Sequence, residues 1–272
     1  MRAFGWLSAI SLALAGCAPT PVAAPAAAGD GGPRRVASLN LCTDELLLLL
    51  ADPEQIASLT YLAANPAEFA LADRARAFPG NGGTLTSIVA ERPDLVLTMG
   101  GSGDKLRIAG RLGIRFIDVP FPNSIDDVIA SVRSVAAALE HEERGEALVT
   151  RIESLRALAP GQPADTIMIG TGGSTIRTDS LSAEWMSLAG YRQRAIGESQ
   201  VRLERLLVDP PAVLLRSDYR NGQYSRGQAW LEHPLSRARA GSRDVLTDGR
   251  LWLCGGPLMA GEVERLRAEQ GQ

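Results

Sequence analysis

Lysine, histidine and aromatic residues are scarce in this chain of 272 residues. Lys105 is the only lysine, and His141 and His233 are the only histidines, which excludes a site that holds a bare Zn²⁺ or Mn²⁺ through several imidazoles. The net charge of −3 provides no basic surface for nucleic acid. The sequence therefore predicts neither a metal site of its own nor a nucleic-acid partner, and it stays compatible with a metal that arrives inside a chelate.

The sequence also lacks an apolar run of the roughly 20 residues that a transmembrane helix requires. Its N-terminal apolar stretch covers only residues 3–14, follows Arg2 and ends in small residues, which is typical of an export signal. The exit reads Leu-Ala-Gly-Cys at residues 14–17 and resembles the lipobox of bacterial lipoproteins. We expect residues 1–16 to be a signal peptide and Cys17 to carry lipid that anchors the periplasmic protein to a cell-envelope membrane. A plain cleavable signal with a chance cysteine is the alternative.

The rest of the chain begins with a tether and continues as alternating strands and helices. Residues 17–33 consist mostly of Ala, Pro, Gly and Thr without an apolar period, which predicts a disordered tether. Thr43 or Asp44 is placed to cap the first helix after it. The alternation predicts a mostly parallel sheet that binds ligands at the carboxyl ends of its strands. The predicted strands are residues 35–39, 55–60, 92–99 and 113–119, and the predicted helices are residues 45–50, 85–91 and 105–112.

Residues 124–160 carry the longest helical pattern. Apolar residues recur at three- and four-residue spacing over most of this stretch, after a start signal at Ser124 and before a stop at Pro160. We expect two helices in tandem. The second, about residues 142–158, is long enough at ~1.5 Å per residue to run between two lobes. The alternative is an ordinary crossover helix inside one continuous α/β domain.

The strand and helix pattern repeats after residue 160. Residues 165–169 predict a strand and residues 182–189 a helix, and the helix–Pro–strand unit at 203–215 is similar to the unit at 85–97. We therefore predict an α/β fold of two similar lobes, each a mostly parallel sheet with flanking helices, joined by a rigid linking helix. The expected boundaries are 34–123 for the N-terminal lobe, 124–160 for the linking helices and 161–272 for the C-terminal lobe.

Several short motifs occur in a recognisable order. Arg-Val-Ala-Ser-Leu opens the fold at residues 35–39, Arg-Pro-Asp-Leu-Val stands at 92–96, and Leu-Gly-Ile at 112–114 leads into the next strand. With the linking helix and the lipobox, this order resembles the periplasmic substrate-binding proteins of ABC importers for ferric siderophores, haem and cobalamin, over about residues 34–268. The resemblance implies a monomeric receptor without turnover or resident cofactor, which closes slightly over a metal chelate or corrinoid and delivers it to an inner-membrane permease.

The resemblance also bears on docking to that permease. In the family, each lobe tends to present an acidic residue seven positions before the Pro of its helix–Pro–strand unit, where it pairs with permease arginines. Glu204 has this position relative to Pro211, whereas the N-terminal lobe has Thr86 at the corresponding position before Pro93. The resemblance thus implies a docking role for Glu204 and an incomplete acidic pair.

Ligand contacts in such a fold come from the loops at the strand ends. Aromatic faces such as Tyr61 and Trp252 suit a flat organic ligand, and the planar guanidinium of Arg220 suits a carboxylate or phosphate. Irregular loops do not reveal which chelate or corrinoid they select. The candidate ligand-binding residues are Asn40, Cys42, Thr43, Tyr61, Met99, Gly100, Gly101, Ser102, Gly172, Gly173, Ser174, Tyr219, Arg220, Trp252 and Cys254.

Cys42 and Cys254 are the only cysteines beyond the lipobox, and we expect both on loops that face the interlobe cleft. Three interpretations are open. An oxidising compartment favours a disulfide, which would clamp the lobes and requires Cα atoms within about 7 Å. Alternatively, one thiol contacts the ligand, or two buried thiols never meet.

An enzyme and a scaffolding lipoprotein are the alternatives to a receptor. Gly-Gly-Ser-Gly at residues 100–103 follows a strand, but the G-x-G-x-x-G spacing fails, and neither a G-x-S-x-G elbow nor a Walker lysine is present. Acid–base chemistry would depend on carboxylates such as Asp44, Glu184 or Asp218, which form no visible pair. A scaffold would show no stabilisation by any small ligand.

Overall fold

The computed structural model describes residues 32–101, 108, 110–111, 113–159, 161–219, 225–234 and 241–270. The predicted signal peptide, Cys17 and the tether up to residue 31 lie outside the described residues. So do Ser102, Arg220 and most of the predicted helix at 105–112. No helix in the described part of the chain has the length and apolar character that crossing a membrane requires.

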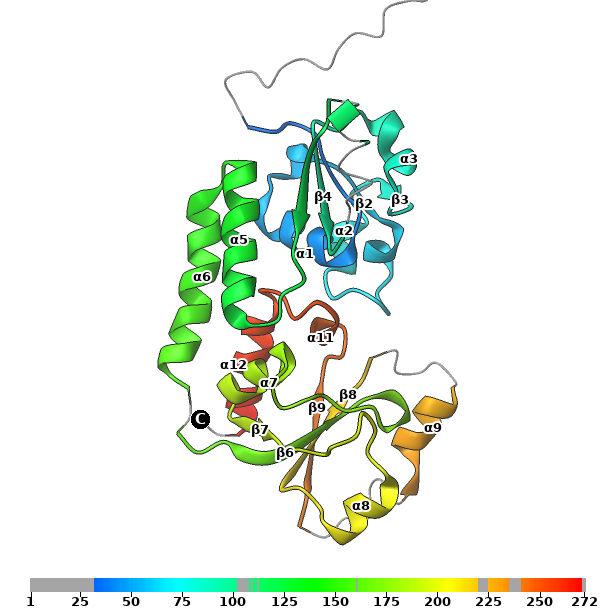
Figure 1. The fold of residues 1–272 in the computed structure, drawn as a ribbon, viewed down its shortest axis with the longest axis vertical. Helices are drawn as coiled ribbons and strands as arrows, with labels where there is room; N and C mark the ends of the chain where they lie inside the picture. The colour runs from blue at the N-terminus through cyan, green and yellow to red at the C-terminus, as the bar shows by residue number, and fades with distance from the viewer. Residues whose placement is uncertain are drawn as a thin grey trace, which may run out of the picture.

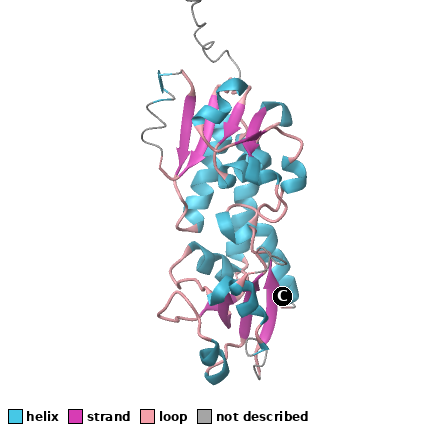
Figure 2. Ribbon diagram, turned by 90° about the vertical axis from the view of Figure 1, so that its right-hand side faces the viewer, coloured by secondary structure: helices cyan, strands magenta, loops and turns pink. Residues whose placement is uncertain are grey.

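Two separate parallel sheets form the two halves of an elongated molecule (Figures 1 and 2). We call the halves the N-lobe and the C-lobe. This arrangement confirms the predicted fold class, two α/β lobes with flanking helices. The N-lobe sheet contains β1 (Val36–Ser38), β2 (Ile56–Thr60), β3 (Gly80–Asn81), β4 (Leu95–Met99) and β5 (Arg115–Val119) in the order β3-β2-β1-β4-β5, and the C-lobe sheet contains β6 (Ala164–Ile169), β7 (Tyr191–Gln193), β8 (Val213–Ser217) and β9 (Arg243–Thr247) in the order β7-β6-β8-β9.

The central strands form where the sequence places continuous buried apolar runs. All five residues of β2 and of β4 are buried, as expected for parallel strands covered on both faces. The prediction missed β3, β7 and β9. The first two have only two and three residues, and β9 is an edge strand in which three of five residues are exposed, so none carries the apolar run that marks a buried strand.

The linking segment is a helical hairpin along one flank of both lobes (Figure 1). The two predicted helices are present as α5 (Ile125–Leu139) and α6 (Glu142–Ala157), and Ser124 caps α5 with a hydrogen bond from the amide of Asp127. The prediction that the second helix runs between the lobes is confirmed, because its Arg144 pairs with Asp52 of the N-lobe and its Arg151 pairs with Glu264 of the C-lobe. Along this path α6 packs closely against α5. Gly145 permits this approach, since a Cβ there would lie 2.5 Å from the Cβ of Ala136.

The remaining helices surround the sheets. Leu41–Leu50 form α1, and the cap of this helix is Asn40, whose side chain accepts the amide of Cys42; the expected caps Thr43 and Asp44 are buried within the first turn. The other α-helices are α2 (Ala72–Ala75), α3 (Leu85–Ile88), α7 (Leu181–Leu188), α8 (Leu203–Val208), α9 (Arg226–Glu232), α11 (Leu251–Cys254) and α12 (Met259–Glu269).

One hydrophobic core runs through both lobes. It joins Leu97 of the N-lobe sheet to Leu215 of the C-lobe sheet through the buried faces of α1, α5, α6 and α12. Each sheet has a smaller cluster on its opposite face, built around Ile88 in the N-lobe and Leu206 in the C-lobe. Alternate residues of β4 pack on opposite faces of the sheet. Leu95 and Leu97 belong to the shared core, and Val96 belongs to the cluster around Ile88. The shared core makes the two lobes parts of a single packed unit.

Candidate functional site

Strand ends from both lobes lead into the junction between them. Met99 ends β4 and Cys42 follows β1 by four residues on the N-lobe side. On the C-lobe side, β8 leads to Tyr219 and β9 leads to α11. The sequence predicts that ligands bind at loops at the carboxyl ends of the strands. The junction where these loops meet is therefore the candidate ligand site.

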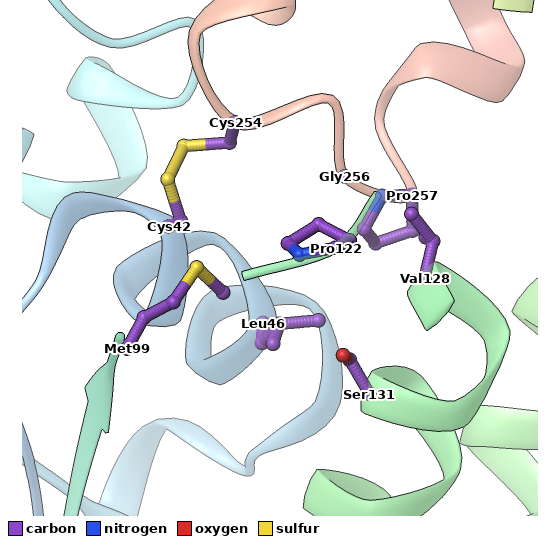
Figure 3. Close-up of a pocket in the computed structure, with 9 residues that line it drawn as sticks. All are labelled: Cys42, Leu46, Met99, Pro122, Val128, Ser131, Cys254, Gly256 and Pro257. Atoms are coloured by element: carbon purple, nitrogen blue, oxygen red, sulfur yellow. A yellow bond between two sulfur atoms is a disulfide. The ribbon is translucent and has the colours of Figure 1, made fainter. Parts of the chain in front are cut away.

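A disulfide joins the two lobes in this junction. Cys42 of α1 and Cys254 of α11 are bonded, with their Cα atoms 5.3 Å apart (Figure 3). Of the three open interpretations, the structure selects the interlobe bond. The expected placement on loops is wrong: Cys42 lies in the first turn of α1, and Cys254 is the last residue of a one-turn helix. The one-turn helix α11 is too short to display helical periodicity, and the leucine run of α1 gives no periodic signal that marks where the helix begins.

A small apolar pocket lies beside the disulfide. Its volume is about 10 Å³, roughly what one water molecule occupies. Figure 3 shows α1, α5 and the chain after α11 converging on it. A pocket of this size holds no chelate in the present arrangement of the lobes. Its lining residues are Cys42, Leu46, Met99, Pro122, Val128, Ser131, Cys254, Gly256 and Pro257.

Two buried carboxyl groups stand at the start of α1. Asp44 accepts the amide and hydroxyl of Thr60, and burial raises its pKa to about 6 despite these bonds. Glu45 reaches across the junction and accepts the amide of Leu258 at 3.0 Å. Burial raises the pKa of Glu45 to about 7, because one amide donor compensates only part of the lost hydration. The Glu45 contact is a polar tie between the lobes.

Two further contacts join the lobes at loop tips. The hydroxyl of Tyr219 donates to the carboxylate of Glu68 at 2.5 Å, and the guanidinium of Arg250 donates to the carbonyl of Pro66 at 2.8 Å. Tyr219 was expected at the site from its place after a strand. Glu68 was not, because nothing in the sequence around it marks a strand end.

Several candidate residues serve the interior of their own lobe. Thr43 is fully buried, and its hydroxyl lies 2.8 Å from that of Ser38. The indole of Trp252 donates to the hydroxyl of Thr247 at 2.6 Å. Gly172, Gly173 and Ser174 follow β6 beside α9, and a Cβ on Gly173 would lie 2.7 Å from the ring of Trp230. The pocket thus gathers Cys42, Met99 and Cys254 from the candidate set, and the binding role of the set stays a prediction.

Exposed apolar side chains flank the junction. Tyr61 follows β2 and is 64% exposed, Phe121 follows β5 and is 58% exposed, and Leu253 of α11 is 51% exposed. Phe121 was missed by the sequence prediction. Its ring lies over Gly100, where a Cβ would come within 1.7 Å of it and where φ is +73°, so both the backbone and the ring require glycine. Gly101 is also exposed, and its amide donates to Asp118.

Within the described residues, no group of three or more His, Cys, Asp or Glu side chains is arranged to hold a metal ion. At the hairpin turn, His141 lies 3.4 Å from Asp52. That contact joins α6 to the N-lobe and lies away from the interlobe junction.

Comparison with known proteins gives matches in structure alone. No family profile and no curated protein matches the sequence. The periplasmic haem-binding protein RhuT of Roseiflexus sp. RS-1 is 21% identical, with 87% of this chain and 97% of that chain covered at a TM-score of 0.66. The vitamin B12-binding protein BtuF of Vibrio cholerae is 17% identical, with 87% and 96% covered at 0.60.

A third similar structure is the siderophore-binding protein BauB, bound to ferric iron and two molecules of acinetobactin. It is 16% identical, with 88% of this chain and 94% of that chain covered at a TM-score of 0.67. The predicted resemblance is thereby confirmed at the level of the fold: the chain has the bi-lobed α/β architecture of periplasmic haem-, siderophore- and vitamin B12-binding proteins.

Proposed function

We propose that this protein is the solute-binding component of an ABC importer, which captures a metal chelate or corrinoid between its lobes and delivers it to a permease without chemical turnover. The observation that carries the proposal is the fold itself, shared over nearly nine tenths of the chain with proteins that bind haem, ferric siderophores and vitamin B12. In this fold, the facing strand ends form the natural place for a ligand.

The exposed side chains at the junction favour a flat or bulky organic ligand. Tyr61 and Phe121 on the N-lobe and Leu253 on the C-lobe offer apolar surface where the strand ends of the two lobes face each other. Exposed apolar side chains at such strand ends are typical of ligand and protein contacts. The 10 Å³ pocket then belongs to a closed, ligand-free arrangement, and binding requires the lobes to separate by the width of the ligand.

The partner surface is proposed on the outer helices. Glu204 is exposed in the first turn of α8, and Thr86 is exposed at the equivalent place in α3. Glu204 would pair with a permease arginine, and the N-lobe would dock without an acidic partner. We further propose that the protein is a periplasmic monomer held at a cell-envelope membrane by lipid on Cys17. A Cys17→Ser variant should then leave the membrane fraction.

Thermal unfolding against a panel of cobalamin, haem and ferric siderophores tests ligand capture. A ligand present at 100 times its dissociation constant should stabilise the native state by about 2.7 kcal/mol. Tyr61→Ala with Phe121→Ala should remove most of that stabilisation and leave the unliganded melting temperature nearly unchanged, because both side chains are mostly exposed. The absence of a response to every member of the panel, both with the interlobe disulfide intact and after its reduction, would contradict the proposal.

The covalent tie between the lobes favours a second candidate function, a scaffolding lipoprotein of the cell envelope. A rigid, closed molecule presents a constant surface, and the small pocket and the disulfide both fit such a role. The two functions differ in the same measurement, since a scaffold gains no stability from any chelate or corrinoid.

A further inference from the structure

The interlobe disulfide fixes the junction where a ligand would have to enter. Apart from the peptide chain itself, it is the one covalent connection between the lobes in the described part of the molecule. Its Cα atoms are 5.3 Å apart, and disulfides span at most about 6.8 Å between Cα atoms. With the bond intact, the start of α1 and the end of α11 can therefore separate by only about 1.5 Å.

The contacts next to the disulfide join the same two segments. Glu45 lies one helical turn after Cys42, and its carboxylate accepts the amide of Leu258, four residues after Cys254. Gly256 lies against that carboxylate, because a Cβ there would approach its Oε1 to 2.5 Å. A single backbone hydrogen bond contributes only about 0.5–1.5 kcal/mol, so of these two contacts the disulfide is the one that limits separation of the start of α1 from the end of α11.

Cys42 and Cys254 are each partly exposed, and both line the interlobe pocket (Figure 3). The apolar side chains of Leu46, Pro122 and Pro257 line the same pocket. Opening the bond would leave the sheets, the shared core and the α5–α6 hairpin in place.

We propose that Cys42–Cys254 is a site of thiol–disulfide exchange that controls whether the lobes can move apart. The reactant is a dithiol, either a small molecule or a dithiol protein of the oxidoreductase class. One thiolate of the dithiol attacks a sulfur of the bond and forms a mixed disulfide, and the other cysteine leaves as a thiolate that takes up a proton. The second thiol of the dithiol then displaces the remaining cysteine. The protein gains two electrons and two protons, and the dithiol becomes a disulfide.

Amide hydrogen exchange of the mature protein, with and without dithiothreitol and without any ligand, tests the proposal. After native reduction, a thiol reagent should detect both cysteines, and the Leu258 amide should exchange about tenfold faster or more, because it is protected by the interlobe contact to Glu45. Amides within α5 and α6 should keep their protection and serve as the internal control. The double variant Cys42→Ser/Cys254→Ser should match the reduced protein, and reoxidation of the wild type should restore slow exchange.

Three results would overturn the proposal. The first is resistance of the bond to dithiothreitol until denaturant is added, which would make it a closed structural bond. The second is reduction that exposes both thiols without any faster exchange at residues 254–258. The third is loss of the far-UV circular dichroism signal both on reduction and in the double variant, in which case the disulfide maintains the fold. Because no ligand is present, none of these results bears on whether the protein binds a chelate.

Discussion

The N-lobe and the C-lobe have the same strand order, but the side chains that they bury at their shared junction differ. The strand order β2-β1-β4-β5 of the N-lobe corresponds to β7-β6-β8-β9 of the C-lobe, and the N-lobe adds only the two-residue edge strand β3. Ile88 in α3 and Leu206 in α8 fill equivalent places behind the two sheets, and both are fully buried. In both lobes the helix–Pro–strand unit supplies the same part of the sheet, α3 with β4 in the N-lobe and α8 with β8 in the C-lobe.

Each lobe buries a carboxyl group near the junction, and only the one in the C-lobe has a cationic partner among the described residues. Glu262 of α12 is 5% exposed and forms two hydrogen bonds to the guanidinium of Arg265 and one to Thr247. Glu45 of α1 is 3% exposed, and among the described residues no cation pairs with it. A buried carboxylate beside a cation stays ionised at low cost, whereas an unpaired one favours the proton. The buried acid on the C-lobe side is therefore paired with a cation, whereas burial without a cation raises the pKa of Glu45 on the N-lobe side.

The largest expected loss of stability comes from the shared core, and it tests whether the two lobes unfold cooperatively. Leu97→Ala in the N-lobe should destabilise the protein by about 2–5 kcal/mol, because it leaves a cavity in the shared core. The three tryptophans beyond the predicted signal peptide are Trp185, Trp230 and Trp252, and all belong to the C-lobe. Denaturant unfolding followed by tryptophan fluorescence should therefore shift as much as unfolding followed by circular dichroism.

Ile88→Ala is the matched control for this comparison. It removes an equally buried side chain from the outer cluster of the N-lobe, outside the shared core. Its cost should fall in the same range of about 2–5 kcal/mol. If Leu97→Ala left the fluorescence transition of the C-lobe unmoved while circular dichroism shifted, the lobes would be independent and the continuous core would carry no coupling between them.

The next effect is the pH dependence that Glu45 imposes. Its pKa in the native state, about 7, lies above the ordinary 4.5, so the native protein binds a proton that the unfolded chain has released. The free energy of unfolding should consequently fall as pH rises from about 4.5 to about 7. Glu45→Gln keeps an acceptor for Leu258 and removes the charge, and at pH 8 it should stabilise the protein by up to about 3 kcal/mol.

Glu262→Gln is the C-lobe counterpart and should have the opposite sign. It removes the charge that Arg265 neutralises, and should destabilise the protein by about 1–3 kcal/mol at pH 8. Urea unfolding at pH 4.5, 6, 7 and 8 measures both variants. The Glu45→Gln curve should retain only the lower part of the pH dependence, which Asp44 contributes through its pKa of about 6. Equal signs for the two variants at pH 8 would contradict the proposed contrast.

A smaller loss of stability is expected from removing the N-cap of the α-helix that follows the first strand of each lobe. Asn40 caps α1 through the amide of Cys42, and Ser180 caps α7 through the amide of Ala183. Asn40→Ala and Ser180→Ala should each cost about 1 kcal/mol, because each leaves a first-turn amide without its side-chain acceptor. Thermal unfolding should show similar losses. A much larger loss for Asn40→Ala would indicate that the cap also supports the disulfide beside it.

The sequence predicts the fold better than the site for a physical reason. Central strands such as β4 and long helices such as α5 follow from apolar periodicity, which one chain displays directly. The junction depends on contacts between distant segments, such as Glu45 with Leu258 and Tyr219 with Glu68. The sequence marks such a residue as a candidate only where it closely follows a predicted strand, as Tyr219 follows β8. The partner of Cys42 was among the candidates because only one other cysteine remained, whereas the choice between a bond and two thiols required the distance between them.

The smallest effect on stability belongs to the docking surface, where the two lobes again differ. Thr86→Glu and Glu204→Ala change exposed residues in equivalent first turns, so each should alter the free energy of unfolding by less than about 0.5 kcal/mol. Their effects on permease binding should be opposite: Glu204→Ala should weaken it and Thr86→Glu should strengthen it, each by at most about fivefold, since an exposed ion pair is worth about 0.2–1 kcal/mol. Binding of the protein to the proposed permease in nanodiscs should be measured at low and high salt, because salt screens charge pairing and leaves other contacts largely unchanged. Unchanged binding for both variants at low salt would mean that neither helix faces the permease, and that docking uses a surface on which the two lobes do not correspond.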